Sequence, residues 1–164
     1  MIDLTDVILN DGKTADYEFQ ITLPALSYRF GDFRIIDSTA GVLQVENKGE
    51  QKLILTGEIE LMVEFPCARC LESVSRRLKV SPELELDLKE KNDYIDGYYL
   101  NVDQVIHDEA LLVWPERVLC RSDCRGLCVK CGQNLNLGTC TCADAPSDPR
   151  MAKILDIFSN YKEV

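Results

Sequence analysis

Alternating apolar and polar residues run through roughly the first hundred positions of the chain and predict β-strands. Apolar residues recur at every second position from Leu53 to Phe65, so one face of this strand is expected to be buried and its glutamates to face water. Further candidate strands cover residues 17–23, 30–36, 40–46, 74–80 and 84–88, with a turn signal at 47–50. The pattern predicts an antiparallel sheet that is curled or barrel-like.

Two later segments change to the helical spacing of apolar residues, which gives an α+β fold class. The first follows Asn101, a good N-cap with Gln104 three residues on as in a capping box, and ends at Trp114-Pro115. The second begins at Asp148-Pro149, an N-cap followed by proline at the first helical position. Its apolar stripe consists of Met151, Ile154, Leu155, Phe158 and Tyr161. We expect this C-terminal stripe to pack on the sheet, with docking of a partner as the alternative.

The eight cysteines form four close pairs along the chain. The pairs are Cys67 and Cys70, Cys120 and Cys124, Cys128 and Cys131, and Cys140 and Cys142. Such spacing lets both thiolates of a pair reach one ion, and Gly132 supplies a residue that can take positive φ at the exit of one turn. Eight thiolates are the number that two closed tetrahedral zinc sites need, so we predict two structural zinc ions. The segment 120–142 holds too few large apolar residues to build a core and needs such a staple.

Loop length favours one grouping of these ligands. Because short loops cost less entropy to close, we expect one site within residues 128–142 and another that joins residues 67–70 to residues 120–124. The rival grouping puts the two CxxC pairs on one ion and leaves the remaining cysteines partly free. In either case the chain divides into a β-rich domain, residues 1–119, and a cysteine-rich segment with the C-terminal helix, residues 120–164, packed together as one unit.

The redox setting favours a metal over disulfides. The first residues lack the basic and apolar regions of a signal peptide, and no apolar run approaches the roughly 20 residues that span a bilayer, so we expect a cytoplasmic protein with reduced thiols. A redox CxxC would start a helix in a βαβ setting, which neither pair does, and the spacing matches neither common ferredoxin pattern. Disulfide, redox and iron–sulfur uses stay as the alternatives.

Charge separates two regions from the rest of the chain. With 18 basic and 28 acidic residues the net charge is −10, which argues against broad nucleic-acid binding and favours a basic protein partner. Residues 67–82, however, hold four basic residues against one acidic residue, and residues 120–142 hold three against one. The arginines concerned are Arg69, Arg76, Arg77, Arg121 and Arg125. They are expected either to stabilise the thiolates or to contact RNA.

No catalytic constellation stands out. A catalytic zinc usually has histidine or carboxylate ligands and an open position, whereas the only histidine, His107, is expected to be a solvated helix residue. The acidic run 82–96 is expected to be a solvated strand edge and loop rather than a two-metal nuclease site. We therefore expect a non-enzymatic protein, with a metal-dependent ribonuclease or a thiol redox protein as the alternative.

Cys67-Ala-Arg-Cys70-Leu71 resembles the CxRCL signature of the YceD family, the large ribosomal RNA subunit accumulation proteins. The tail from Cys120 to Asn136, then Gly138 to Cys142 and Asp148-Pro-Arg150, is similar to the full cysteine-rich tail of family members from Gram-positive bacteria. The resemblance implies a bacterial ribosome-biogenesis factor that supports accumulation or processing of large-subunit (23S) ribosomal RNA. It implies binding of precursor rRNA, of a large-subunit ribosomal protein, or of both, and no active site. A zinc-stapled interaction module unrelated to ribosomes is the alternative.

Overall fold

One long strand, β6 (Lys52–Pro66), is central to the sheet in the computed structural model, which describes residues 1–29 and 31–142. Its odd-numbered side chains from Leu53 to Phe65 are buried on one face, with Gly57 half-buried among them, and its even-numbered side chains face the other way. The alternation that the sequence predicted for this strand is confirmed. Because both edges of β6 are paired, its alternation also sets the alternation of the strands beside it.

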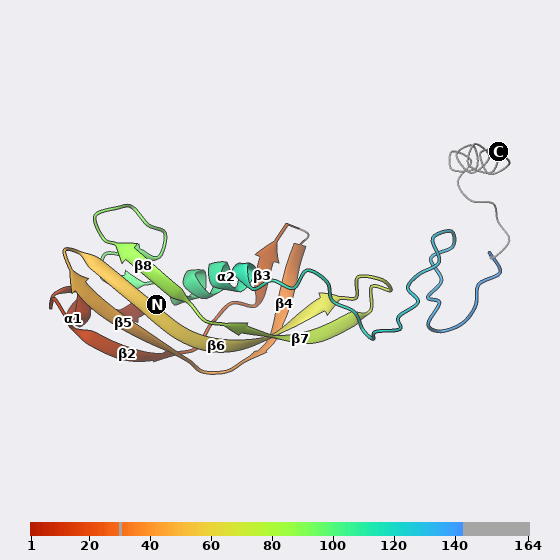
Figure 1. Ribbon diagram of the computed structural model, residues 1–164, viewed down its shortest axis with the longest axis horizontal. Coiled ribbons are helices and arrows are strands. Elements are labelled where there is room, and N and C mark those ends of the chain that lie inside the picture. The colour runs from red at the N-terminus through yellow and green to blue at the C-terminus, as the bar shows by residue number, and fades with distance from the viewer. Residues whose placement is uncertain (30, 143–164) are drawn as a thin grey trace, which may run out of the picture.

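Each edge of β6 carries a row of two shorter strands placed end to end (Figure 1). One row consists of β4 (Gly31–Ser38) and β5 (Gly41–Gly49), and the other consists of β7 (Ser73–Val80) and β8 (Glu83–Asp87). A further row, β2 (Thr14–Phe19) and β3 (Ala25–Tyr28), pairs with β5 and β4. All of these pairings are antiparallel, as predicted.

The sheet stays open, so of the two expected forms, curled or barrel-like, the closed barrel is wrong. The rows β2/β3 and β7/β8 form opposite edges and do not pair with each other in the described part of the chain. The helix α2 (Val102–Leu112) packs against β7 and β3 on the inner face, where a closed barrel would have its interior. Figure 1 shows this helix along the hollow side of the curved sheet, whereas no described element covers the opposite, outer face.

The core lies between the inner face of the sheet and α2. Asn101 caps this helix by accepting a hydrogen bond from the backbone N–H of Gln104 at 3.3 Å. The backbone N–H of Asn101 donates to the carbonyl of Tyr94 at 2.7 Å, and the Gln104 side chain donates to Asp108 at 3.0 Å, so Gln104 does not complete the expected capping box. The buried side chains of the helix are Val102, Val105, Ile106 and Ala110. They share one core cluster with inner residues of the sheet such as Leu61 and Val80.

A small three-stranded sheet, which the sequence pattern did not indicate, closes the end of the core away from the cysteines (Figure 1). It consists of β1 (Ile2–Asp3), β10 (Tyr99–Leu100) and β9 (Ile95–Asp96), next to the short helix α1 (Thr5–Ile8). Asn47 ties this end to the main sheet, because its buried amide donates to the carbonyls of Val7 at 2.9 Å and Ile8 at 3.1 Å. Two-residue strands are too short to show a period, which is why the pattern missed them.

Two elements expected from the sequence differ from, or lie outside, what the structure describes. The C-terminal helix predicted after Asp148-Pro149, with its apolar stripe, lies outside the described residues. The strand predicted at 17–23 ends earlier, at Phe19, and beyond it the backbone N–H of Thr22 donates to Asp103 at 3.0 Å rather than to a strand partner.

Within residues 1–29 and 31–142, no helix combines the length and the apolar character needed to cross a membrane.

Candidate metal centres

Four cysteines meet where the tip of the β6–β7 hairpin contacts the segment after α2, and we call them the inner tetrad. The inner tetrad consists of Cys67, Cys70, Cys120 and Cys124. A backbone hydrogen bond from Ala68 to the carbonyl of Val118, 2.8 Å long, holds the two parts of the chain together. Three of the four cysteines are almost completely buried and pack with Leu119 and Leu127 in a small cluster separate from the main core. The hairpin tip and the distant segment are thus joined around sulfur atoms.

The sulfur positions of the inner tetrad fit a closed tetrahedral site. The Sγ atoms of Cys67 and Cys124 are 3.8 Å apart, and those of the other pair are 3.5 Å apart. All four lie within 4.8 Å of one another, and all are free thiols. Metal–sulfur bonds of about 2.3 Å place the sulfurs of a tetrahedral site about 3.8 Å apart. The inner tetrad could therefore hold one metal ion with little movement.

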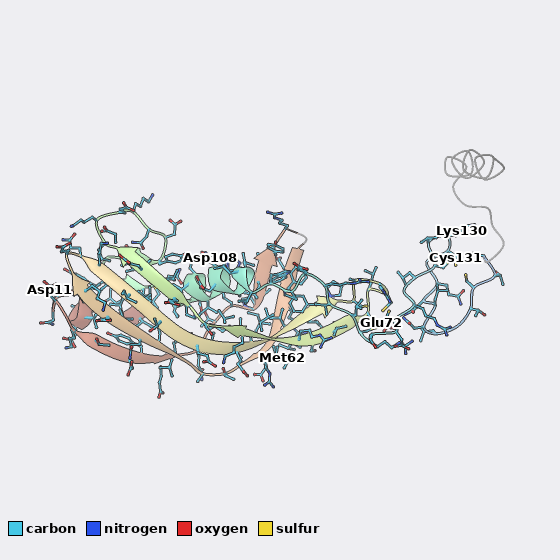
Figure 2. All side chains as sticks on the ribbon, viewed as in Figure 1. Asp11, Met62, Glu72, Asp108, Lys130 and Cys131 are labelled. Carbon is cyan, nitrogen blue, oxygen red and sulfur yellow. The ribbon has the colours of Figure 1, made fainter. Side chains whose placement is uncertain are left out.

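A second set, the outer tetrad, lies further along the cysteine-rich segment. It consists of Cys128, Cys131, Cys140 and Cys142, whose sulfurs also lie within 4.8 Å of one another. The structure thus has the grouping that loop length favoured, and the two CxxC pairs belong to different sets. The outer tetrad is the more exposed, since Cys131 lies at the surface and Val129 and Leu137 are 98% and 82% exposed. Figure 2 shows Cys131 beyond the end of the sheet, past the hairpin turn that carries Glu72.

The two CxxC loops share one hydrogen-bond geometry. In the first loop the N–H of Leu71 donates to the carbonyl of Cys67 at 3.0 Å, and in the second the N–H of Gly132 donates to that of Cys128 at 2.9 Å. Both donors have positive φ, 63° at Leu71 and 74° at Gly132. Glycine adopts this conformation freely, as the sequence suggested, whereas a leucine pays about 1–2 kcal/mol for it. Contacts elsewhere in the fold must therefore offset this cost at Leu71. Its turn directs the sulfurs of Cys67 and Cys70 toward one point.

Two asparagines attach the segment between the tetrads to the inner tetrad. The side-chain amide of Asn136 donates to Cys124 Sγ at 3.3 Å, and its oxygen accepts from the backbone N–H of Arg125 at 2.8 Å. Asn134 donates to the Glu72 carboxylate at 2.9 Å. Cysteine spacing did not reveal these residues. The signal that could have suggested them is the alternation of asparagine and leucine at 134–137, between the CxxC and CxC pairs.

Backbone N–H groups make one thiol of each tetrad unusually acidic. Burial raises the pKa of Cys67, but N–H donors of its own loop and of Cys120 outweigh burial and lower this pKa to about 6. The N–H groups of Lys130 and Cys131 likewise lower the pKa of Cys128 to about 6. The backbone N–H of Glu72 lowers the pKa of Cys70, yet burial and the neighbouring sulfurs raise it to about 12. Each tetrad thus offers at least one ready thiolate to a cation, and protons would leave the other sulfurs if an ion bound.

Two of the arginines singled out in the sequence support the backbone beside the inner tetrad. Arg69 donates to the carbonyl of Cys124 at 2.6 Å. Arg76 donates to the carbonyl of Leu119 at 3.1 Å. Both bonds reach from the hairpin to the segment that supplies the second pair of cysteines. These cations therefore help to hold that segment in place.

The remaining three arginines occupy two different surfaces. Arg121 donates to Asn136 at 2.9 Å, so it lies with Arg125 next to the inner tetrad. Arg77 follows Arg76 in β7 but points to the outer face of the sheet, where it pairs with Glu60 at 3.3 Å. The five candidate RNA-binding residues consequently do not form a single patch.

The histidine takes no part in either tetrad. His107 is half-buried in α2, contrary to the expectation of a solvated residue, with Nδ1 2.8 Å from an Asp108 oxygen and Nε2 3.2 Å from the carbonyl oxygen of Ser27. It therefore links α2 to β3. Among the described residues, the two cysteine tetrads are the sets of cysteine, histidine and carboxylate groups placed to hold a metal ion.

Comparisons with known proteins give one family and a few relatives. A family model described as "Large ribosomal RNA subunit accumulation protein YceD" matches residues 55–158. An uncharacterised protein of Mycobacterium tuberculosis is 30% identical over 132 residues, which cover 71% of this chain and 60% of the relative. An uncharacterised protein of Mycobacterium leprae is 28% identical over 154 residues, covering 85% of this chain and 70% of the relative. The chain thus spans 60% of the length of the first of these relatives. No solved structure is significantly similar to it.

Replacing Asn136 by leucine should weaken metal binding at the inner tetrad. The substitution removes the donor to Cys124 Sγ and the acceptor for Arg125 while keeping a side chain of similar size. Loss of such a supporting hydrogen bond lowers metal affinity about 10- to 100-fold. The measurement is competition for Zn²⁺ with a chelating dye, in a background with Cys128→Ser and Cys140→Ser so that a single site titrates.

Gln133→Leu in the same background is the matched control for this prediction. The Gln133 side chain donates to the carbonyl of Thr139 at 3.4 Å and is not bonded to an inner-tetrad sulfur. Its replacement should leave the affinity of the inner tetrad within about twofold of the parent, on the scale of a surface substitution. Equal affinities for the Asn136 and Gln133 variants would contradict a supporting role for Asn136.

Proposed function

The chain belongs to the YceD family of large ribosomal RNA subunit accumulation proteins, and from this we propose that it is a non-enzymatic ribosome-biogenesis factor of the cytoplasm. It supports accumulation or processing of 23S ribosomal RNA by binding precursor rRNA, a large-subunit ribosomal protein, or both. The family description supports the role in rRNA accumulation. The observation that supports the binding mechanism is the presence of two cysteine tetrads at one end of the molecule. Basic residues lie around these tetrads, whereas the molecule as a whole is acidic.

Zinc is the ion that we assign to both tetrads, in a structural role. Four thiolates at these separations suit Zn²⁺, which accepts tetrahedral sulfur ligation. A full set of four protein ligands leaves no open position for water or substrate, which a catalytic zinc site requires. Two zinc ions would fix the cysteine-rich segment, which has few apolar residues of its own, against the hairpin tip.

Precursor rRNA is the partner proposed for the tetrad end. Arg76 lies on the inner face of the sheet, beside the link that follows α2, and Arg121 and Arg125 continue along the cysteine-rich segment. Neutralisation of phosphates is the main source of RNA affinity, so cations at one end can bind RNA although the net charge is negative. Because four thiolates outweigh the charge of a zinc ion, the basic field is weak and the contact is expected to be local.

A basic large-subunit ribosomal protein is the partner proposed for the outer face of the sheet, which Met62 marks in Figure 2. Four salt bridges lie on this face, joining Glu46 to Lys48, Glu85 to Lys52, Glu60 to Arg77 and Glu58 to Lys79. Further acidic residues of this face, outside those four pairs, are Asp16, Glu18, Asp37, Glu64 and Glu83. This excess of negative charge favours a positively charged partner.

A thiol redox protein or a metal-dependent ribonuclease is the competing function. The observation in favour of redox chemistry is the exposure of Cys131 in the outer tetrad, since an accessible thiolate is what such chemistry needs. A ribonuclease would need an open metal position instead. Co-purification with ribosomal components separates the proposed role from that of an interaction module unrelated to ribosomes.

Protein purified under reducing conditions should contain two zinc ions per chain and no thiol that reacts with a thiol reagent before denaturation. All eight cysteines would then be ligands, because zinc-bound thiolates in closed sites are protected. Elemental analysis and a free-thiol titration on one sample give both numbers. Cys120→Ser and Cys140→Ser, one in each tetrad, should each lose one zinc ion. One zinc ion or none, with reactive cysteines, would contradict the assignment and favour thiol chemistry.

Arg76→Ala should weaken binding to precursor 23S rRNA about three- to tenfold and reduce its salt dependence by the equivalent of about one phosphate contact. Arg77→Ala is the matched control, because it is adjacent in β7 but lies on the outer face in a salt bridge with Glu60. It should change RNA affinity less than about twofold. Fluorescence anisotropy with labelled fragments of precursor rRNA, at several salt concentrations, measures both quantities. Equal effects of the two substitutions would argue against RNA binding on the inner face.

Neutralising the outer face should weaken binding to basic ribosomal proteins about fivefold or more and leave RNA binding unchanged, since rim charges act chiefly on attraction to an oppositely charged partner. The test variant combines Glu18→Gln, Asp37→Asn and Glu83→Gln, which lie on three different strand rows. The control variant combines Asp11→Asn, Glu90→Gln and Asp93→Asn, which are exposed and lie outside the strands and helices. Binding of both to RNA-free large-subunit proteins is compared by co-sedimentation on beads. Equal loss in the two variants would show a net-charge effect rather than a docking face.

A further inference from the structure

A cleft of about 370 Å³ lies next to the inner tetrad, between the ends of β3, β4 and β6 and the link that follows α2. Trp114 lines it and contacts three other aromatic rings. The centroid of the Trp114 ring is 4.7 Å from that of Phe33, 5.0 Å from that of Tyr28 and 5.1 Å from that of Phe65. Four aromatic rings from four different elements of the chain therefore meet in one place, and all four line the cleft.

The aromatic rings are only partly used by the core. Phe65 is buried, whereas Tyr28, Phe33 and Trp114 are each half-buried, so part of each ring faces the cleft. Two of the contacts to Trp114 are edge-to-face, with interplanar angles of 78° and 70°. The volume lies in the range of small-ligand sites, which are mostly apolar with a few polar groups. Aromatic rings whose only role was to cover the core would pack together without a cleft between them and the solvent.

Positive charge lies beside these rings. Arg117 lines the cleft together with Glu116. Arg76 lies on the same inner face, one inward position along β7 from Val74, which is paired with Phe65. Its guanidinium reaches the carbonyl of Leu119 at 3.1 Å, two residues beyond Arg117. The lining of the cleft thus combines aromatic surfaces with Arg117 and Glu116, and Arg76 lies on the adjoining part of the inner face, at the end of the molecule where basic residues gather.

The inner tetrad fixes one wall of this cleft. Ala68, inside the first CxxC loop, lines the cleft and donates its backbone N–H to the carbonyl of Val118, which also lines it. Val118 is buried two residues before Cys120. Ligation of a metal by the inner tetrad would therefore hold the link carrying Trp114 and Arg117 in position.

We propose that this cleft binds an unpaired base of single-stranded RNA, stacked on the exposed surfaces of Trp114, Phe33 and Tyr28, with the flanking phosphates at Arg76 and Arg117. Bases of unpaired RNA are recognised by stacking on aromatic side chains with arginine nearby, and bases inside a duplex cannot reach such a cleft. The inference rests on the proposed binding of precursor rRNA and adds which RNA feature is bound. It requires that single-stranded RNA bind more tightly than a duplex of the same sequence.

Trp114 allows a direct test, because it is the only tryptophan of the chain. The probes are a single-stranded RNA of about ten nucleotides, the same strand with abasic positions, and its duplex. Stacking of a base on the indole ring should quench tryptophan emission with the midpoint that fluorescence anisotropy gives for binding. The abasic strand and the duplex should bind at least about fivefold more weakly and cause little quenching, since stacking of one base contributes about 5- to 150-fold in affinity.

Substitutions separate stacking from general attraction. Tyr28→Leu and Phe33→Leu should each lower affinity for the single strand about fivefold or more. Tyr99→Leu, a half-exposed tyrosine in β10 outside the cleft, should leave it unchanged. Zinc content and far-ultraviolet circular dichroism confirm that each variant is folded. Trp114→Phe keeps an aromatic ring at this position, so it should retain most of the RNA affinity measured by anisotropy.

The possible failures are distinguishable. RNA binding without a change in tryptophan emission, and with equal affinity for the Tyr28 and Tyr99 variants, overturns the cleft as the base site but leaves the proposed function standing. Absence of any RNA binding overturns both. Quenching by RNA-free ribosomal proteins but not by RNA overturns this proposal in favour of a protein partner at the same cleft.

Discussion

The meeting of four sulfur atoms at the tip of the β6–β7 hairpin is the interaction on which the whole cysteine-rich end depends. It joins Cys70 to Cys120 across fifty residues of chain that include α2. The main core orders most of these fifty residues, but ordering the apolar-poor segment that follows them costs conformational entropy that a small buried cluster offsets only in part. The metal–sulfur bonds that we propose would supply the missing stabilisation. The link with Trp114, the position of Arg76 and the attachment of the outer tetrad through Asn136 all follow from this junction.

The arginines near the tetrads show how a structural role and a binding role can share one site. Arg69 and Arg76 donate to backbone carbonyls of the ligand-bearing segment rather than to sulfur. They stabilise the fold of that segment and bring positive charge towards the thiolates at the same time. A guanidinium has five N–H donors, so one bond to a carbonyl leaves most of its donors for other contacts. The alternative between stabilising thiolates and contacting RNA is therefore not exclusive for Arg76.

Two kinds of feature were predictable from the sequence: strands, from the alternation of apolar and polar residues, and the grouping of cysteines, from the lengths of the loops between them. Alternation defined β6 and its neighbours, and loop entropy gave the correct grouping of the tetrads. Features that depend on several distant elements were not predictable. Strand alternation predicts that Arg76 and Arg77 lie on opposite faces of the sheet. It does not predict which of the two faces α2 covers. The aromatic cleft draws Tyr28, Phe33, Phe65 and Trp114 from four elements, and in the sequence Trp114 indicated only where a helix ends. The open sheet has the same origin, because the packing of α2, not the strand pattern, excludes closure.

The geometry of the sheet would keep the two proposed partners apart, in addition to the difference in charge between its faces. Residues of one strand alternate between the faces, so β7 can present Arg76 to the inner face and Arg77 to the outer face without any change in its backbone. On the outer face Arg77 and Lys79 pair with glutamates, and further acidic residues leave a net negative surface. On the inner face, α2 covers part of the sheet. The aromatic cleft and the tetrads lie beyond the part that α2 covers. A ribosomal protein and an RNA strand could consequently be held at once, each on its own side, and neither would have to displace the other.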